Sequence, residues 1–161
     1  MMGFFTRLFA RAEPVLSAAT SRDSAAIAAL HAECFRRGWS EEEVANLLID
    51  RHVVAHRAMA GPAIAGFILS RVVEDEAEIL SVAVASRWRG HGLAANLLNL
   101  HLRRLAGFGA RVVFLEVDEH NKPAVRLYDR ARFHQVSLRP NYYPADAGAE
   151  IAALVLRRDL V

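Results

Sequence analysis

The segment Arg89-Gly90-His91-Gly92-Leu93-Ala94 places two glycines between an apolar stretch and a leucine-rich one. Glycine has no Cβ atom, so the backbone N–H groups here can turn toward a ligand and approach it closely. If a helix begins at Leu93, its first N–H groups have no partner within the helix and lie at the positive end of its dipole, which suits a diphosphate. The spacing alone fits a simple tight turn equally well. It matches neither a Walker A loop nor the full dinucleotide fingerprint.

Glu116 is a carboxylate within the otherwise apolar run of residues 112–117. Partial burial in such a run suits a glutamate to act as a general base, either directly or through a water molecule. A glutamate near the end of a strand can also simply form an ion pair at the surface. The residues by themselves leave both roles open.

The hydrophobic pattern predicts the strands and helices that would position these residues. Strands are expected at residues 14–19, 52–59, 63–72, 78–84, 111–117, 132–138 and 150–157. Helices are expected after a cap at residues 21–23, from Ser40 to Leu48, from Leu93 to about Gly107, and from Asn121 to Ala131. Ser40 and Glu43 have the spacing of a capping box. Residues 141–144 are expected in a polar loop between the last two strands.

Length and composition indicate one α/β domain over residues 13–161, preceded by a short amphipathic arm at residues 1–12. Cys34 is the only cysteine, so no disulfide can form within the chain and a cytoplasmic location is expected. No apolar run approaches the ~20 residues that cross a membrane. The arginine pairs are dispersed, which is typical of solvated surface rather than of a nucleic-acid patch. The histidines show no metal-ligand spacing, so no metal site is expected.

Arg89, Gly92 and Ala94 fill the specified positions of the pattern Arg/Gln-x-x-Gly-x-Gly/Ala. Following an apolar strand, this pattern resembles the acyl-CoA diphosphate loop of the GNAT acetyltransferase superfamily, and the similarity in the order of elements runs from about residue 14 to residue 158. Further segments resemble the RimI-type ribosomal-protein-alanine N-acetyltransferases: Trp39-Ser40, Leu115-Glu116-Val117, Asn121, Leu127-Tyr128, Phe133 and Asn141-Tyr142-Tyr143-Pro144. The resemblance implies a mixed, mostly antiparallel sheet of about seven strands, flanked by about four helices and splayed near the cofactor.

The resemblance also implies roles for individual residues. Glu116 would be the catalytic base. Tyr128 would be the general acid, since a phenol (pKa near ~10) can give a proton to a thiolate (thiol pKa near ~8.5), although Tyr128 can also pack in the core. The residues implied to bind acetyl-CoA are Val82, Ala83, Val84, Arg89, Gly90, His91, Gly92, Leu93, Ala94 and Asn121. Residues 82–84 would pair with the pantetheine arm like an added strand and polarise the thioester carbonyl through a backbone N–H group. Asn121 is also expected to cap the helix that follows it.

Aromatic residues are expected to line the channel for the acceptor, with Phe35 and Trp39 on one side and Tyr142 and Tyr143 on the other. Trp39 can instead anchor the second helix. Residues 74–78 include four carboxylates, which is typical of a solvated face but could also attract a basic acceptor. Asp118 stands where the RimI-type pattern usually has an arginine, and this departure bears on which peptide is accepted.

The leading hypothesis is direct transfer of acetyl from acetyl-CoA to a protein N-terminal amine in a ternary complex. The resemblance implies that this is the N-terminal alanine of the eighteenth small-subunit ribosomal protein. The alternatives are acetylation of a small amine, such as a polyamine or an antibiotic, acetylation of a protein lysine, or a non-catalytic acyl-CoA-binding module. The presence of both Glu116 and Tyr128 argues against the last. The expected partners are acetyl-CoA and a ribosomal protein, with no nucleic acid and no membrane.

Overall fold

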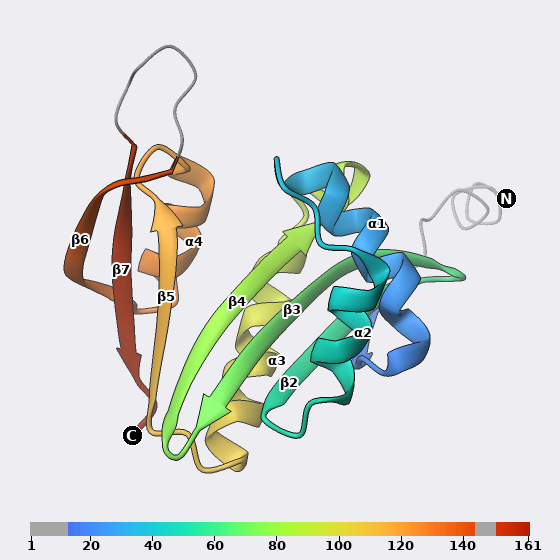
Figure 1. Ribbon diagram of the computed structural model, residues 1–161, viewed down its shortest axis with the longest axis horizontal. Helices are drawn as coiled ribbons and strands as arrows, with labels where there is room; N and C mark the ends of the chain where they lie inside the picture. The colour runs from blue at the N-terminus through green and yellow to red at the C-terminus, as the bar shows by residue number, and fades with distance from the viewer. Residues whose placement is uncertain (1–12, 144–150) are drawn as a thin grey trace, which may run out of the picture.

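The computed structural model describes residues 13–143 and 151–161. Within these ranges the strands form one sheet in the order β1-β2-β3-β4-β5-β7-β6 (Figure 1). β4 and β5 are parallel, and the other neighbouring strands are antiparallel. The strands are β1 (Val15–Ala18), β2 (Val53–Ala60), β3 (Ala63–Val73), β4 (Glu76–Val84), β5 (Val112–Asp118), β6 (His134–Tyr143) and β7 (Ile151–Asp159). The predicted mixed, mostly antiparallel sheet is confirmed.

Four α-helices flank the sheet in the described part of the chain: α1 (Ser24–Cys34), α2 (Glu41–Ile49), α3 (Leu93–Gly107) and α4 (Lys122–Arg130). The predicted caps of α2 and α4 are present, whereas residues 21–23 form a short 3-10 helix and Asp23, the N-cap residue of α1, makes no side-chain capping bond. Ser40 Oγ accepts a hydrogen bond from Glu43 N at 3.1 Å, and Glu43 Oε2 accepts one from Ser40 N at 2.7 Å. Asn121 Oδ1 accepts from Ala124 N at 3.3 Å at the start of α4. No helix among the described residues is long and apolar enough to cross a membrane.

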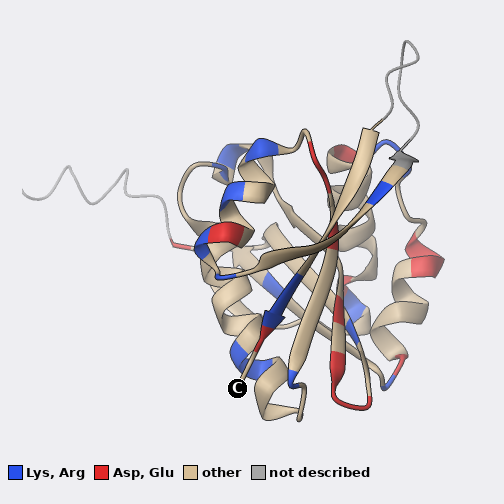
Figure 2. Cartoon of the chain, turned by 90° about the vertical axis from the view of Figure 1, so that its left-hand side faces the viewer, with Lys and Arg blue, Asp and Glu red and all other residues tan. Residues whose placement is uncertain are grey.

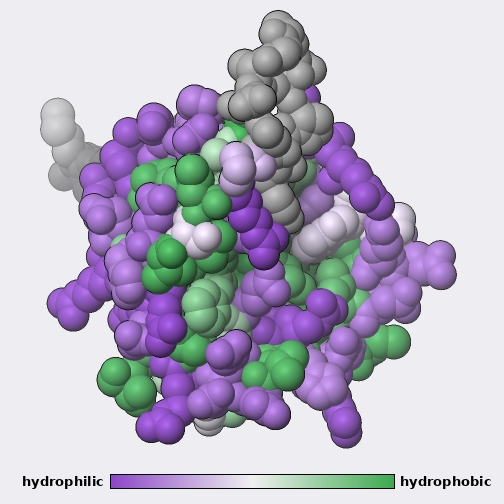
Figure 3. Space-filling view, turned by 60° about the vertical axis from the view of Figure 1, so that its left-hand side comes forward, coloured by the Kyte–Doolittle hydropathy of each residue, from purple (hydrophilic) through white to green (hydrophobic). Residues whose placement is uncertain are grey.

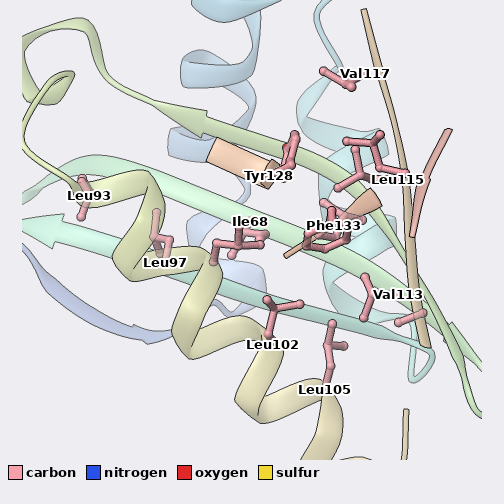
Figure 4. Packing of buried hydrophobic residues seen from close by; sticks show 14 of the residues in the cluster. Ile68, Leu93, Leu97, Leu102, Leu105, Val113, Leu115, Val117, Tyr128 and Phe133 are labelled. Atoms are coloured by element: carbon pink, nitrogen blue, oxygen red, sulfur yellow. The ribbon is translucent and has the colours of Figure 1, made fainter. Parts of the chain in front are cut away.

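The two faces of the sheet carry separate apolar clusters, and α3 covers one of them. Leucines at helical spacing along α3 pack against Ile68, Val113 and Leu115, and Tyr128 of α4 joins the same cluster (Figure 4). We call this side the α3 face. On the other side, which we call the α1–α2 face, α1 packs over Phe67 and neighbouring residues of β3 and β4. Successive strand side chains point to opposite faces, so Glu116, which lies between two residues of the α3 cluster, points to the α1–α2 face.

β4 and β5 separate part-way along their length. Their register partners are only Glu76–Val112, Ala77–Val113 and Glu78–Phe114. Beyond these pairs β5 continues beside β7 and β4 continues beside β3, so an opening separates the two halves of the sheet (Figure 1). A bulge in β4 at Leu80, where the register against β3 shifts, lies where the strands part. The expected splay of the sheet is therefore present.

β6 extends further than its sequence predicts. The sequence predicts that the strand ends at Leu138, but it continues to Tyr143. The prediction of a loop at residues 141–143 is therefore wrong. Pro140 lacks the N–H group that a central strand would need, but β6 is an edge strand and tolerates it, with an irregular register between Arg139 and Tyr143. Residues 144–150 lie outside the described part of the chain. On this side of the molecule apolar residues reach the surface among hydrophilic ones (Figure 3).

A hydrogen-bonded chain of polar residues lies inside the α3 face. His101 Nδ1 is 2.7 Å from His56 Nδ1, and His101 Nε2 is 2.6 Å from Ser70 Oγ. All three residues are buried. Burial lowers the pKa of His101 to about 3, with a smaller contribution from His56, and burial also lowers the pKa of His56. Both imidazoles are therefore neutral in the folded protein at neutral pH.

We expect this chain to make the protein acid-sensitive. A histidine in the unfolded chain titrates near pH 6.5, whereas folded His101 titrates near pH 3. As the pH falls between these values, the unfolded state therefore binds a proton that the folded state does not bind. The free energy of unfolding should decrease over that window by up to about 1.4 kcal/mol per pH unit through His101, and the lowered pKa of His56 adds to the decrease in the same direction. Urea denaturation of H101Q at pH 7, 6 and 5 should show a shallower pH dependence than wild type. H120Q, which changes an exposed histidine, should match wild type. Equal slopes for H101Q and wild type would contradict this expectation.

Candidate active site

The edge of β4 that faces the opening is not paired with β5 beyond Glu78. Ala85 N donates to Ala65 O at 2.8 Å, so alternation along the antiparallel ladder directs the N–H and C=O groups of Ala83 toward β3. The corresponding groups of Val82 and Val84 then face the opening. Consistent with this, Val84 O accepts a hydrogen bond from Arg89 Nε at 3.2 Å. Residues 82–84 therefore offer an extended ligand the edge of a strand to pair with.

The glycine segment forms the connection between β4 and α3 that its sequence predicts. Gly90 and Gly92 both have φ of +77°, a left-handed conformation that favours glycine, and a Cβ at either position would meet no other atom within 4 Å. α3 begins at Leu93, and its first main-chain hydrogen bond runs from Asn96 N to Gly92 O. The N–H groups of the first turn are thus left without partners within the helix, beside open space. This end of the helix suits a diphosphate.

Arg89 fixes the start of this segment to the end of β4. Besides its bond to Val84 O, its Nη2 lies 3.4 Å from Cys34 Sγ at the end of α1. Leu93 is buried at the start of α3, whereas His91 is exposed and contacts the edge of the Trp88 ring. Open space lies beside the backbone at both glycines of this segment. The residues present therefore fit an acyl-CoA molecule, with the diphosphate at α3 and the pantetheine along β4.

Glu116 lies on β5 across the opening from β4, and its side chain is 19% exposed. Arg139 Nη1, on β6, forms an ion pair with Glu116 Oε1 at 2.7 Å. The ion pair considered as an alternative role for this glutamate is thus present. It is compatible with base function, because the carboxylate faces the same open side of the sheet on which an acceptor would arrive.

Tyr128 lies on α4 and is buried on the α3 face, where its ring meets Phe133 edge-on at a centroid distance of 5.6 Å. Tyr128 therefore packs in the core, which is one of the two roles that its sequence position suggests; the other is that of general acid. Glu116 and Tyr128 therefore lie on opposite faces of the sheet. One can serve a nucleophile that arrives from the α1–α2 face, and the other a leaving group on the α3 face.

Phe35 and Trp39 are brought together by His31. The His31 ring stacks on Phe35 at 4.4 Å and on Trp39 at 4.1 Å, and its Nδ1 accepts a hydrogen bond from Trp39 N at 3.1 Å. Burial lowers the pKa of His31, so the ring is neutral and can accept this bond. The anchoring role of Trp39 has a structural basis in these contacts. Tyr142 and Tyr143 lie at the end of β6, but their side chains are outside the described part of the structure.

Residues 24–133 match the family model of the acetyltransferase (GNAT) family. The chain belongs to the GNAT family. It is accordingly an acetyl-CoA-dependent N-acetyltransferase. The fold, the free edge of β4 and the glycine loop at α3 are the features of this GNAT enzyme that could be anticipated from its motifs.

Curated relatives of this GNAT enzyme include the [ribosomal protein bS18]-alanine N-acetyltransferase of Escherichia coli strain K12. The two are 32% identical over 117 residues, which cover 73% of this chain and 78% of the relative. The corresponding enzyme of Haemophilus influenzae is 34% identical over 93 residues, which cover 58% of this chain and 63% of the relative. Among solved structures, the E. coli ribosomal-protein-S18-alanine N-acetyltransferase superposes with a TM-score of 0.84 at 26% identity, covering 91% of this chain and 94% of the other. Arabidopsis thaliana NAA60 in complex with acetyl-CoA shares the fold, with a TM-score of 0.80 at 21% identity over 91% of this chain and 98% of the other.

Two residues at the site of this GNAT enzyme were not anticipated from the sequence. Arg139 pairs with Glu116 only because β7 lies between β5 and β6, and no local pattern indicates that order. His31 does leave a local signal, since it lies four residues before Phe35 on the same side of α1. Its stacking on Trp39, however, depends on the loop that follows the helix.

Proposed function

We propose that this enzyme acetylates the N-terminal α-amine of a protein, with Glu116 as the general base and Tyr128 as the general acid. The observation that carries the proposal is that Glu116 lies on the part of β5 that has separated from β4, on the opposite face of the sheet from Tyr128. Bound acetyl-CoA supplies the thioester. Backbone N–H groups of Val82 and Val84, which face the opening, can donate to the thioester oxygen as negative charge develops on it.

The proton transfers follow from this arrangement. As the amine nitrogen bonds to the thioester carbon, Glu116 takes one proton from that nitrogen. As the carbon–sulfur bond breaks, the Tyr128 hydroxyl gives a proton to the sulfur, which leaves as the thiol. Exchange with solvent then returns a proton to Tyr128 and removes one from Glu116. Asn121, which caps α4, is proposed to contact the coenzyme A arm as well.

The proposed acceptor is an N-terminal alanine of a small-subunit ribosomal protein. Its support is the similarity to relatives named as [ribosomal protein bS18]-alanine N-acetyltransferases. Phe35, Trp39, Tyr142 and Tyr143 are proposed to wall the acceptor channel, and of these Phe35 and Trp39 lie together on His31. A channel with aromatic walls suits an extended peptide chain.

The test is acetyl-CoA turnover with three acceptors: a ribosomal peptide that begins with alanine, the same peptide with a blocked N-terminus and an internal lysine, and spermidine. We expect turnover with the first peptide only, and mass spectrometry should place the acetyl group on the α-amine. Turnover with spermidine or with the blocked peptide, but not with the free N-terminus, would replace the proposed acceptor by one of those classes.

A further inference from the structure

A cavity of about 500 Å³ lies against α2 on the α1–α2 face, and the established activity does not account for it. Its lining residues come from α2 and the loop and turn on either side of it and from strands β3 and β4: Trp39, Glu43, Asn46, Leu47, Asp50, Arg71 and Leu80. Trp39, Leu47 and Leu80 give it apolar walls, and the other residues are polar. Such a mixture suits a long side chain with an apolar stem and a polar end.

The cavity lies close enough to the opening for an acceptor chain to reach it. Leu80, at the bulge of β4, belongs to its lining and precedes Val82 by two residues, about 7 Å along a strand. Trp39 belongs both to the cavity and to the aromatic group on His31. An extended peptide advances about 3.3–3.6 Å per residue. If its first nitrogen is at the opening, its second to fourth residues can therefore place a side chain in the cavity.

The charges around the cavity favour a cation. Glu43 and Asp50 contribute two carboxylates, against one guanidinium from Arg71. The Asp50 carboxylate accepts a hydrogen bond from His52 N at 2.8 Å, which lowers the pKa of Asp50 and keeps it ionised. Arg71 is the register partner of Glu78 on β4, so a further carboxylate lies beside it.

The surroundings on β3 and β4 are acidic as well. Residues 74–78 form the turn between these strands and the start of β4, and Figure 2 shows this acidic turn at the bottom of the view. Two side chains compete for these carboxylates: Arg37 lies 4.0 Å from Glu43 with a side chain that is 91% exposed, and His52 Nδ1 lies 3.3 Å from Asp50 Oδ1. An ion pair as exposed as that of Arg37 is weak, so a ligand can displace it.

We propose that this cavity binds an arginine or lysine side chain from the second to fourth residue of the acceptor, an inference that rests on the proposed function. The apolar walls hold the aliphatic stem of that side chain, and the carboxylates of Glu43 and Asp50 face its charged end. The charge of Arg71 repels a cationic side chain and so limits the preference for it. If the cavity instead binds an acidic acceptor side chain through Arg71, the proposal is wrong.

The test compares two peptides that share a free N-terminal alanine and carry either arginine or glutamine at positions two to four. Wild type is expected to have a KM about fivefold to tenfold lower for the arginine peptide, and added salt should reduce the difference. In E43Q and D50N the difference should shrink, because glutamine retains the capping box and asparagine retains the bond from His52 N while the charge is lost. In R71Q the difference should grow.

The outcomes separate this inference from the proposed function. If neither peptide is acetylated, the proposed function fails. If both are acetylated with equal KM, or if E43Q and D50N leave the preference intact, only the cavity assignment fails. A preference for a peptide with glutamates at these positions that R71Q abolishes would assign the cavity to an anion instead. Melting temperatures and the KM for acetyl-CoA, measured for each variant, show whether a change is confined to the acceptor.

Discussion

Replacement of Glu116 by glutamine is expected to lower kcat with a peptide acceptor by about 10²- to 10⁴-fold near neutral pH, the usual contribution of a general base. Glutamine keeps an oxygen that can accept a hydrogen bond from Arg139 Nη1, so the contact between β5 and β6 across β7 should persist. The variant lacks only the carboxylate that would take up the proton. A free α-amine has a pKa near ~7.7–8, so below this pH the acceptor carries an extra proton. The deficit of E116Q should therefore be largest at low pH and should shrink as the pH rises above about 9.

E119Q is the matched control for this variant. Glu119 follows β5 and accepts a hydrogen bond from Ala152 N at 3.3 Å through an oxygen that glutamine also has. It is a carboxylate near the same strand end without a place in the proposed chemistry, so kcat should stay within about twofold of wild type. A pH–rate profile of E116Q parallel to that of wild type would remove Glu116 from the role of base, and its ion pair with Arg139 would then be its function.

The features that could be predicted from the sequence are those that short segments determine by themselves. The capping box of α2 and the cap of α4 depend on residues three positions apart, so their patterns identify them. The positive φ of Gly90 and Gly92 fits glycines that join a strand to a helix within a few residues. The leucine spacing of α3 likewise reflects one apolar face on one helix.

The features that could not be predicted depend on which strands lie next to each other. The pair of Glu116 with Arg139 requires β7, the last strand, to insert between β5 and β6. The lining of the cavity beside α2 includes Leu80, at a bulge that changes the register between β3 and β4 without any glycine to mark it. Pro140 suggests the end of a strand for the same reason, because proline is tolerated within β6 only at the edge of the sheet, and that position cannot be predicted locally.

Features determined by one segment and features determined by strand order meet at the opening between β4 and β5. The glycine loop and the edge of β4 belong to one continuous segment, residues 82–94, which is proposed to hold the cofactor. The groups proposed to act on the acceptor and the leaving group come from β5 and α4, on the far side of the opening. The proposed cofactor site is therefore determined by one segment of the sequence, whereas the proposed acceptor site depends on how the two halves of the sheet meet.

Replacement of Gly92 by valine is expected to raise the KM for acetyl-CoA by about 10- to 100-fold. A β-branched residue is strained at the φ of +77° that Gly92 adopts, so the backbone should shift at the start of α3. That shift would misplace the N–H groups proposed to hold the diphosphate, and each hydrogen bond to a charged group contributes about 1.5–3 kcal/mol. Steady-state kinetics with varied acetyl-CoA, together with direct binding of coenzyme A by calorimetry, measures the effect.

Gly61 provides the control that separates ligand binding from turn geometry. It lies in the turn between β2 and β3 with φ of +61°, and a Cβ there would also meet nothing within 4 Å. G61V therefore carries similar backbone strain at a place with no proposed ligand. Both variants should lose a comparable amount of stability, about 1–2 kcal/mol by urea denaturation, but only G92V should lose affinity for acetyl-CoA. Equal KM values for acetyl-CoA in the two variants would mean that the glycines of the loop serve the turn alone, because the strain common to both sites would then account for the whole effect.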